Sequence, residues 1–286
     1  MQLNNMPFAL PDLFYDRIQK NLTEASNEFW FIFKETKLLV DQDTMQPFQM
    51  KDLAFKSTLY MGIFKEYHVH IGEALLAVPP LGAIWQDLRG LYGKIDEALF
   101  ALAGRAAQLI VWHHTHQFCG QCGSQMTDSQ TERAKECTCC HLLAYPKICP
   151  AMMALIRKGD EILLARGTRA PMGFYSLLAG FVEPGETLEQ CVEREVFEEV
   201  GLYVEDIQYF GSQAWPFPNS LMIAFTCKWK RGEITIDPSE IVDAQWFKKD
   251  NLPLLPPPFS LSRILIDAAI ARQIDKTDES SPMQAP

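Results

Sequence analysis

The sequence predicts an α+β protein in which helices cover a mixed β-sheet. Strand-like runs occupy much of residues 148–252, and one long amphipathic helix interrupts them. A second helix-like run follows at residues 260–274. A cysteine-rich polar stretch precedes this region, and another set of strand-like runs precedes the cysteines. The 286 residues are therefore enough for two domains with their own cores and a smaller unit between them.

The composition is that of an ordinary globular protein, with 48% hydrophobic and 22% charged residues. The formal net charge of −10 argues against electrostatic binding of long nucleic acids, but it is compatible with a local basic pocket. No apolar run is long enough to cross a bilayer. The first residues, MQLNNMPFALPDLF, lack a basic segment followed by an apolar one. We therefore expect no membrane association, no secretory signal and a cytoplasmic protein.

We divide the chain into four segments. They are an N-terminal α/β domain at 1–112, a cysteine-rich ribbon at 113–147, a third domain at 148–272 and a disordered polar tail at 273–286. In the first segment, residues 29–40 and 58–72 are expected to form strands joined by a polar loop, and residues 99–118 have helical spacing. No catalytic constellation is visible there, so its apolar residues are most simply core.

The third segment carries the clearest alternation of strands and helices. Strands are expected at 148–159, 160–166, 174–182, 203–213, 221–230 and 232–236, and helices at 187–200 and 260–274. The first two strands are separated by the turn Lys158-Gly159-Asp160, which is a good hairpin signal. This order predicts a mixed sheet with helices packed against it.

Six of the eight cysteines lie between Cys119 and Cys149, in a chain without a visible signal peptide. Such clustering favours metal binding over a disulfide framework. Two Cys-x2-Cys pairs, Cys119 with Cys122 and Cys137 with Cys140, supply four thiolates, which suits one tetrahedral and therefore structural Zn²⁺ per chain. Cys139 lies between the ligands of the second pair and can replace Cys140, so the fourth ligand stays open.

The helix expected at 187–200 gathers Glu195, Glu198 and Glu199 within an arc of roughly 100°. Like charges at these spacings repel, and they lie near the C-terminal end, where the helix dipole already disfavours negative charge. A cation must offset this repulsion, and carboxylates favour Mg²⁺ or Mn²⁺, which also bind phosphates. Arg194 can orient one carboxylate through a bidentate bond. The competing interpretation is a solvated acidic face, which the adjoining glycines and apolar stripe disfavour.

The stretch GFVEPGETLEQCVEREVFEEVGL, from Gly180 to Leu202, matches the box of the Nudix hydrolases at every defined position. The resemblance implies an α/β/α sandwich with a mixed sheet, preceded here by the ribbon and the N-terminal α/β domain. It also implies metal-dependent hydrolysis of a diphosphate linked to another moiety. In this family the divalent metal is held by the glutamates of the box.

A second motif, SQAWPFPNS, begins ten residues after the box. Its two prolines exclude a helix and a central strand, so Trp215 and Phe217 stand on a rigid loop that either walls a core or stacks on a flat ligand. The motif resembles the SQPWPFPxS signature of the NADH pyrophosphatase branch, with Ala214 in place of the first proline. The cysteine pairs, AGR at 103–105, IDPSE at 236–240 and LPLLPPP at 252–258 resemble that branch as well.

The resemblance implies a set of site residues. The metal ligands would be the backbone carbonyl of Ala179 and the carboxylates of Glu195, Glu199 and Glu240, with Glu198 a further ligand or the base. Substrate contacts would come from Arg89, Tyr145, Gln213, Ala214, Trp215, Pro216, Phe217, Pro218, Asn219, Ser220 and Ser262. A homodimer is implied by the family, and no spacing in the sequence indicates it.

The reaction implied is cleavage of the central pyrophosphate of NAD(H) to NMN(H) and AMP. Bacterial members of this branch also remove NAD caps from RNA 5′ ends by cleaving the same bond. One alternative is a Nudix hydrolase for another nucleotide, such as ADP-ribose or a dinucleoside polyphosphate, against which SQAWPFPNS argues. The other is a non-catalytic nucleotide sensor, which usually has an eroded box, whereas all the glutamates are present here.

Overall fold

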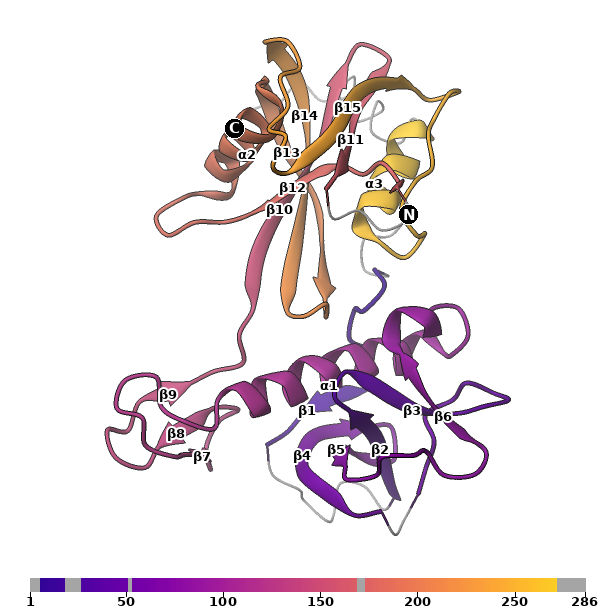
Figure 1. Cartoon of the computed structure of the whole chain (residues 1–286), viewed down its shortest axis with the longest axis vertical. Coiled ribbons are helices and arrows are strands. Elements are labelled where there is room, and N and C mark those ends of the chain that lie inside the picture. The colour runs from indigo at the N-terminus through magenta and orange to yellow at the C-terminus, as the bar shows by residue number, and fades with distance from the viewer. Residues whose placement is uncertain (1–5, 19–26, 51–52, 169–172, 272–286) are drawn as a thin grey trace, which may run out of the picture. The chain divides into compact units, whose positions relative to one another are not determined.

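The computed structural model describes residues 6–18, 27–50, 53–168 and 173–271 (Figure 1). The described residues form two compact units, each with its own sheet. The C-terminal unit holds Met6 and the described parts of 149–213 and 220–271, and the N-terminal unit holds those of 7–148 and 214–219. The tail predicted at 273–286 lies outside the described residues. No described helix is long and apolar enough to cross a membrane.

The C-terminal unit is built on a mixed sheet in the order β13-β14-β10-β11-β15, with β12 paired to β10. Its elements are β10 (Cys149–Lys158), β11 (Glu161–Gly167), β12 (Leu178–Phe181), α2 (Leu188–Val200), β13 (Tyr203–Trp215), β14 (Ser220–Arg231), β15 (Ile241–Lys248) and α3 (Leu261–Ile270). Strand β10 is parallel to β14 and antiparallel to β11 and β12. The predicted mixed sheet and hairpin at Gly159 are therefore confirmed.

Alternating residues of β10 supply two separate cores. Met152, Ala154 and Ile156 pack in a cluster with Val192 and Val196 of α2. Met153 and Leu155 pack in a second cluster that contains the buried residues of α3. Because successive side chains of a strand point to opposite faces, α2 and α3 cover opposite faces of the sheet. The predicted α/β/α sandwich is thus confirmed (Figure 1).

The strand predicted at 232–236 is wrong. In the structure this segment has no regular secondary structure and pairs with no described strand. Instead, the N–H of Thr235 donates to the carbonyl of Val200, and the N–H of Asp237 donates to the carbonyl of Glu199. Carbonyls in the last turn of a helix have no partner within the helix, so the segment satisfies the end of α2 rather than a sheet edge. This contact also fixes the segment beside Glu199.

The N-terminal unit contains a six-stranded sheet in the order β1-β4-β5-β2-β3-β6. Its elements are β1 (Phe14–Asp16), β2 (Asn27–Lys34), β3 (Lys37–Asp41), β4 (Phe55–Phe64), β5 (Tyr67–Ala74), β6 (Ala83–Asp87), the 3₁₀-helix η2 (Leu88–Leu91) and α1 (Glu97–Thr115). Each of the two runs expected to be strands, 29–40 and 58–72, is a hairpin. The tight turns at Glu35 and Lys65 have φ of 55° and 54°, a conformation that neither residue type signals.

The cysteine-rich ribbon belongs to the N-terminal unit. It forms a small antiparallel sheet of β7 (Met126–Asp128), β8 (Lys135–Cys137) and β9 (Leu143–Ala144), in that order. Helix α1 runs on to Thr115, so it continues past the boundary predicted after residue 112. The ribbon has a small core of its own, made of cysteine side chains with Met126 and Ala144.

Candidate active site

Helix α2 begins and ends where the sequence predicts. The side chain of Thr187 accepts from the N–H of Gln190, and the Gln190 side chain accepts from the N–H of Thr187, which completes a capping box. Gly201 ends the helix in the left-handed conformation, with φ of 72°. These two caps fix the ends of the helix, and the packing of Val192 and Val196 on the sheet sets its rotation and so the direction of each glutamate.

Glu199 is the most unusual carboxylate of the site. Its side chain is only 6% exposed, and Oε2 has no hydrogen-bond partner among the described residues. Burial, followed by the charges of Glu195, Glu240 and Glu198, raises the pKa of Glu199 to about 8. Burial likewise raises the pKa of Glu195. An unpaired buried carboxylate is costly, so a cation ligand is the simplest reason for its position.

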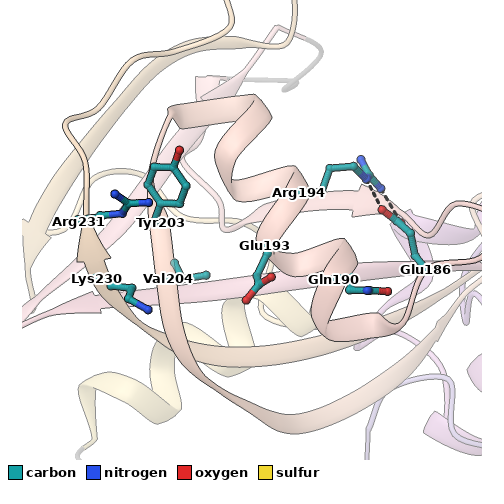
Figure 2. Close-up of a pocket in the computed structure, with 8 residues that line it drawn as sticks. All are labelled: Glu186, Gln190, Glu193, Arg194, Tyr203, Val204, Lys230 and Arg231. Atoms are coloured by element: carbon teal, nitrogen blue, oxygen red, sulfur yellow. Dashed lines mark hydrogen bonds and ion pairs between the residues drawn. The ribbon is translucent and has the colours of Figure 1, made fainter.

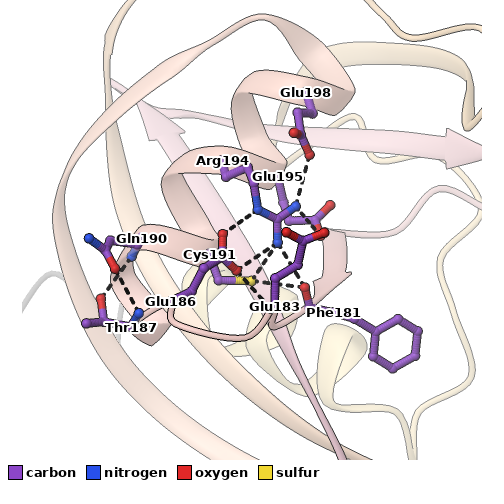
Figure 3. A network of polar contacts seen from close by, with 9 residues as sticks. All are labelled: Phe181, Glu183, Glu186, Thr187, Gln190, Cys191, Arg194, Glu195 and Glu198. Atoms are coloured by element: carbon purple, nitrogen blue, oxygen red, sulfur yellow. Dashed lines mark hydrogen bonds and ion pairs between the residues drawn. The ribbon is translucent and has the colours of Figure 1, made fainter.

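Arg194 organises the neighbouring carboxylates (Figure 3). Its Nε and Nη2 bind the two oxygens of Glu186 at 2.5 and 2.9 Å, which confirms the predicted bidentate pair. Its Nη1 donates to Glu195 Oε1 and to Glu198 Oε2, both at 2.9 Å. The hydrogen bonds from Arg194 lower the pKa of Glu186 to about 2. Arg194 therefore holds three carboxylates, and no cation among the described residues binds Glu199.

Gly180 is required by the close approach of the helix to β12. A Cβ built at this position would lie 1.8 Å from Cδ of Glu195, which no side chain could accommodate. The backbone of β12 and the Glu195 carboxylate are thus in direct contact. Ala179, the predicted carbonyl ligand, is the adjacent residue of β12 and is exposed. Its place beside Gly180 puts it at the same edge of the helix.

Glu240 reaches the cluster through a tight turn. Asp237 Oδ1 accepts from the N–H of Ser239 at 2.8 Å, and the N–H of Glu240 donates to the carbonyl of Asp237 at 3.2 Å. The N–H of Asp237 is itself bonded to the carbonyl of Glu199. The turn therefore places Glu240 close enough for its charge to raise the pKa values of Glu195 and Glu199.

The donor set fits a hard divalent cation. It combines four carboxylates, one of them buried with an orphaned oxygen, and an adjacent exposed strand backbone. The carboxylates are not drawn around a single point: among the described residues, only the cysteine quartet brings three or more potential ligand atoms within 4.8 Å of one another. Mutual repulsion explains the spacing, since Arg194 is the only cation that binds these glutamates directly in the described network.

The segment here called the WPFP loop, residues 214–219, packs within the N-terminal unit. Ala214 and Trp215 are the last residues of β13, so only residues 216–219 form the turn, and Trp215 does not lie on a loop as predicted. The Trp215 and Phe217 rings meet edge-on with centroids 5.1 Å apart, and both also contact Phe8 edge-on. Pro216 is buried. The guanidinium of Arg89 lies 4.0 Å from the centroid of Phe217. The structure thus brings together two predicted substrate-binding residues that are far apart in the sequence, and the loop serves partly as a core wall.

A cavity of about 300 Å³ adjoins this stacked pair. Its lining combines Arg89 and Phe217 with the two flanking prolines, Thr36, Asp87 and Leu88, and two residues of α1, Ala107 and Val111. The volume is at the lower end for ligand pockets, and the lining combines an aromatic ring with one cation. Such a lining suits part of a nucleotide.

Gly104, in the AGR motif, lets the WPFP loop approach α1. A Cβ there would lie 2.7 Å from Cδ1 of Phe8 and 3.1 Å from Cγ of Pro216. We expect Gly104→Val to displace the loop, lowering stability by about 1–3 kcal/mol and raising KM for NADH about tenfold. Gln108→Val is the matched control, since it places the same valine side chain on α1 at a partly exposed position. Equal KM values for both variants in steady-state assays would contradict this role.

The remaining predicted substrate residues take different places. Gln213 is 2% exposed, and its amide bonds the carbonyl of Phe259 and the N–H of Leu261, each at 2.8 Å. Its side chain is therefore engaged with the start of α3. Ser262 is buried and bonds Ser176 and the N–H of Leu177. Ser220 is buried at the start of β14, Asn219 donates to the carbonyl of Lys147 at 3.1 Å, and Ala214 is half-buried.

The cysteine quartet converges as predicted. The Sγ atoms of Cys119, Cys122, Cys137 and Cys140 lie within 4.8 Å of one another, with the pairs Cys119–Cys140 at 3.6 Å and Cys122–Cys137 at 3.4 Å. Four sulfurs around zinc lie about 3.8 Å apart when each is about 2.3 Å from the metal. The spacing fits Zn²⁺, and it brings in Cys140 while the exposed Cys139 stays outside the quartet.

Comparison with known proteins identifies the family of the chain. The family model of the NUDIX domain matches residues 147–266, and that of the NADH pyrophosphatase-like rudimentary NUDIX domain matches residues 27–112. The NAD-capped RNA hydrolase NudC of Stutzerimonas stutzeri is 42% identical over 88% of this chain and 90% of its own length. The chain belongs to the Nudix superfamily, in the NudC branch. The protein of the same name from Deinococcus radiodurans is 41% identical over 94% of this chain and 96% of its own.

Among solved structures, a NUDIX hydrolase from Nitrosomonas europaea is similar over 58% of this chain and 94% of its own, with 22% identity and a TM-score of 0.46. The family models also explain the N-terminal segment, which the sequence predicted only as an α/β domain. It matches a rudimentary Nudix domain, and its long helix α1 carries a single carboxylate, Glu97. No glutamate cluster therefore signals the family in this helix.

Two charged residues of the ribbon of this Nudix protein, Glu132 and Arg133, make contacts that the sequence did not predict. The hydroxyl of Tyr145, a predicted substrate contact, donates to Glu132 at 2.9 Å. The next residue, Arg133, donates to the carbonyls of Tyr60 and Met61 at 3.0 Å and pairs with Asp16. Asp16 also pairs with the arginine of the AGR motif, Arg105, at 2.6 Å. No local pattern signals this network, because its members are far apart in the chain.

Proposed function

We propose that this protein is a metal-dependent pyrophosphatase that cleaves NAD(H) to NMN(H) and AMP and removes NAD caps from RNA 5′ ends. The observation that carries the proposal is the presence of all four site glutamates, one of them buried and unpaired, in a chain that covers 90% of a relative named NAD-capped RNA hydrolase. Both substrates contain the same pyrophosphate bond. One site therefore serves both reactions.

The proposed cation is Mg²⁺ or Mn²⁺, held by the carboxylates of Glu195, Glu199 and Glu240 with the carbonyl of Ala179. When bound, it would neutralise charge on the pyrophosphate and lower the pKa of an attacking water. Arg194 fixes the rotamers of Glu195 and Glu198 through its two bonds from Nη1. Glu198 is 56% exposed, so it is the glutamate best placed to accept a proton from water.

Recognition of the dinucleotide is assigned to the WPFP loop with Arg89 and Tyr145. The stack of Arg89 on Phe217 offers a flat cationic surface beside the cavity, suited to an aromatic base or a phosphate. Tyr145 is 53% exposed, so its ring remains available for a ligand although its hydroxyl is bonded. Ser262 contributes through its backbone at the start of α3, because its side chain is already engaged. Gln213, in β13, positions the start of α3 through its two side-chain bonds.

The two alternatives are less well supported. ADP-ribose hydrolysis needs no nicotinamide clamp, whereas this chain resembles full-length relatives named for NAD-capped RNA. A catalytically silent sensor would not need a buried unpaired Glu199. The proposal further includes structural Zn²⁺ in the ribbon and a cytoplasmic location. It also includes a homodimer; the dimer rests on the family resemblance, and light scattering would check it.

Product analysis tests the proposed function. With Mg²⁺ or Mn²⁺ supplied, NADH should yield NMNH and AMP, and NAD-capped RNA should yield RNA with a 5′-monophosphate. ADP-ribose should be hydrolysed at least about tenfold less efficiently than NADH, which corresponds to about 1.4 kcal/mol of discrimination. A preference for ADP-ribose over both NAD-containing substrates would overturn the proposal.

A further inference from the structure

A second pocket lies in the C-terminal unit, between α2 and residues of β13 and β14 (Figure 2). Its volume is about 680 Å³, within the range of small-molecule sites. Glu186, Gln190, Glu193 and Arg194 line it from the helix and the loop before it. Tyr203, Val204, Lys230 and Arg231 line it from β13 and β14.

This pocket is separate from the metal site. Gln190 and Glu193 are three residues apart and share one face of α2, whereas Glu199 is nine residues from Gln190, roughly 180° around the helix. Glu199 is buried and Glu193 is exposed, in agreement with this opposition. The two sites meet only at Arg194, which lines the pocket and holds Glu195. A ligand bound here would not replace the scissile phosphates.

The strand side of the pocket presents two cations and an aromatic ring. The guanidinium of Arg231 stacks 4.1 Å from the centroid of Tyr203, and it has no ion-pair partner among the described residues. Lys230 is 3.6 Å from Glu205, but both side chains are more than half exposed, so a ligand phosphate can displace this weak pair. Tyr203 is 41% exposed, which leaves part of its ring open. This side suits a phosphate next to a base.

On the helix side, Arg194 is already bonded to three glutamates, which leaves Glu193 as the unengaged charged group. Glu193 has no hydrogen-bond or ion-pair partner among the described residues and lies across the pocket from Lys230 (Figure 2). A carboxylate so placed repels a phosphate but accepts from ribose hydroxyls or base amino groups. We propose that this pocket binds one nucleotide, with its phosphate at Lys230 and Arg231, its base on the Arg231–Tyr203 stack and its polar edge at Glu193.

Two sources of that nucleotide share this chemistry. One is a nucleotide in the RNA body of a capped substrate, which rests on the proposed function. The other is a free mononucleotide. The RNA source is favoured because an acidic protein with a net charge of −10 needs a local cationic contact to hold RNA beyond its cap. Arginine and tyrosine are also the usual stacking partners of single-stranded bases.

The test compares Lys230→Ala/Arg231→Ala with the wild-type protein and with Lys249→Ala, which removes an exposed charge outside the pocket. Affinity for a short uncapped oligoribonucleotide, measured by fluorescence anisotropy, should fall at least about tenfold in the double variant only. Its kcat/KM for NAD-capped RNA should fall in parallel, with that for NADH unchanged. Arg231→Lys keeps the charge but loses the planar stack, so its affinity should be intermediate.

If the ligand is a free mononucleotide, calorimetry with AMP should show two sites per wild-type chain and one in the double variant, while RNA binding is unaffected. This result also supports a nucleotide pocket. The proposal is overturned if neither ligand distinguishes the double variant from Lys249→Ala, or if NADH hydrolysis falls as much as that of capped RNA. Failure of the wild type to hydrolyse NADH would refute the proposed function alone, because oligonucleotide binding is measured without turnover.

Discussion

Replacing Glu199 by Gln is expected to lower kcat for NADH on the order of 10³-fold without unfolding the protein. A metal ligand stabilises transition-state charge by several kcal/mol, and about 4 kcal/mol corresponds to this factor. Glutamine has nearly the same shape, and the buried Oε2 of Glu199 has no described partner to lose. The measurement is steady-state hydrolysis with saturating Mg²⁺, together with circular dichroism of the folded variant.

Glu199→Gln should also remove a pH-dependent loss of folding stability that we expect in the metal-free protein. The pKa of Glu199 is about 8 in the folded protein, against 4.5 for a free glutamate. A raised folded pKa favours the protonated form, so its stability contribution is complete below about pH 4.5 and is lost as the pH rises through about 8. Without Mg²⁺ or Mn²⁺, wild type should lose on the order of 3–5 kcal/mol relative to Glu199→Gln over this window.

Urea unfolding at pH 5 and pH 8 measures this difference, and adding Mg²⁺ at pH 8 should restore the stability of wild type only. Glu189→Gln is the matched control, because it makes the same chemical change in the first turn of α2 at an exposed position. It should keep both activity and pH dependence. Parallel pH curves for wild type and Glu199→Gln would show that Glu199 is not held as a strained, unpaired carboxylate.

The features that the sequence predicted well are those encoded locally. The capping box of Thr187 and Gln190, the stop at Gly201 and the apolar stripe of α2 all lie within fifteen residues, so their pattern is legible without the fold. The same holds for the cysteine pairs, whose spacing predicts a four-thiolate site, although the structure was needed to select Cys140 over Cys139. The prediction failed where a segment satisfies a distant partner, as residues 232–236 do with the end of α2.

Most of the features that the sequence did not predict depend on contacts between residues far apart in the chain. Gln213 looks like a ligand contact in the sequence, yet its amide is bonded to the backbone at Phe259 and Leu261. Arg105 belongs to a recognisable motif, but its partner Asp16 is 89 residues away. The hairpin turns at Glu35 and Lys65 were missed for another reason, since they use positive φ without glycine or asparagine.

Removing the ribbon metal is expected to unfold the ribbon and to weaken substrate binding more than catalysis. Its own core consists mainly of cysteine side chains, so without Zn²⁺ little apolar burial remains to offset chain entropy. Tyr145 follows β9 directly, and its partner Glu132 lies in the loop between β7 and β8. Loss of the ribbon separates this pair, whereas the glutamates of the C-terminal unit keep their own scaffold.

Cys137→Ser is the sharpest form of this experiment, because Cys137 is fully buried within the quartet. The variant should lose its zinc, lose amide-exchange protection over residues 117–144 and raise KM for NADH about tenfold or more, with a smaller change in kcat. Cys139→Ser is the matched control, since Cys139 is exposed and outside the quartet, and it should keep one zinc per chain. Zinc loss in Cys139→Ser but not in a Cys140→Ser variant would reverse the ligand assignment, and full protection in zinc-free protein would refute the structural role.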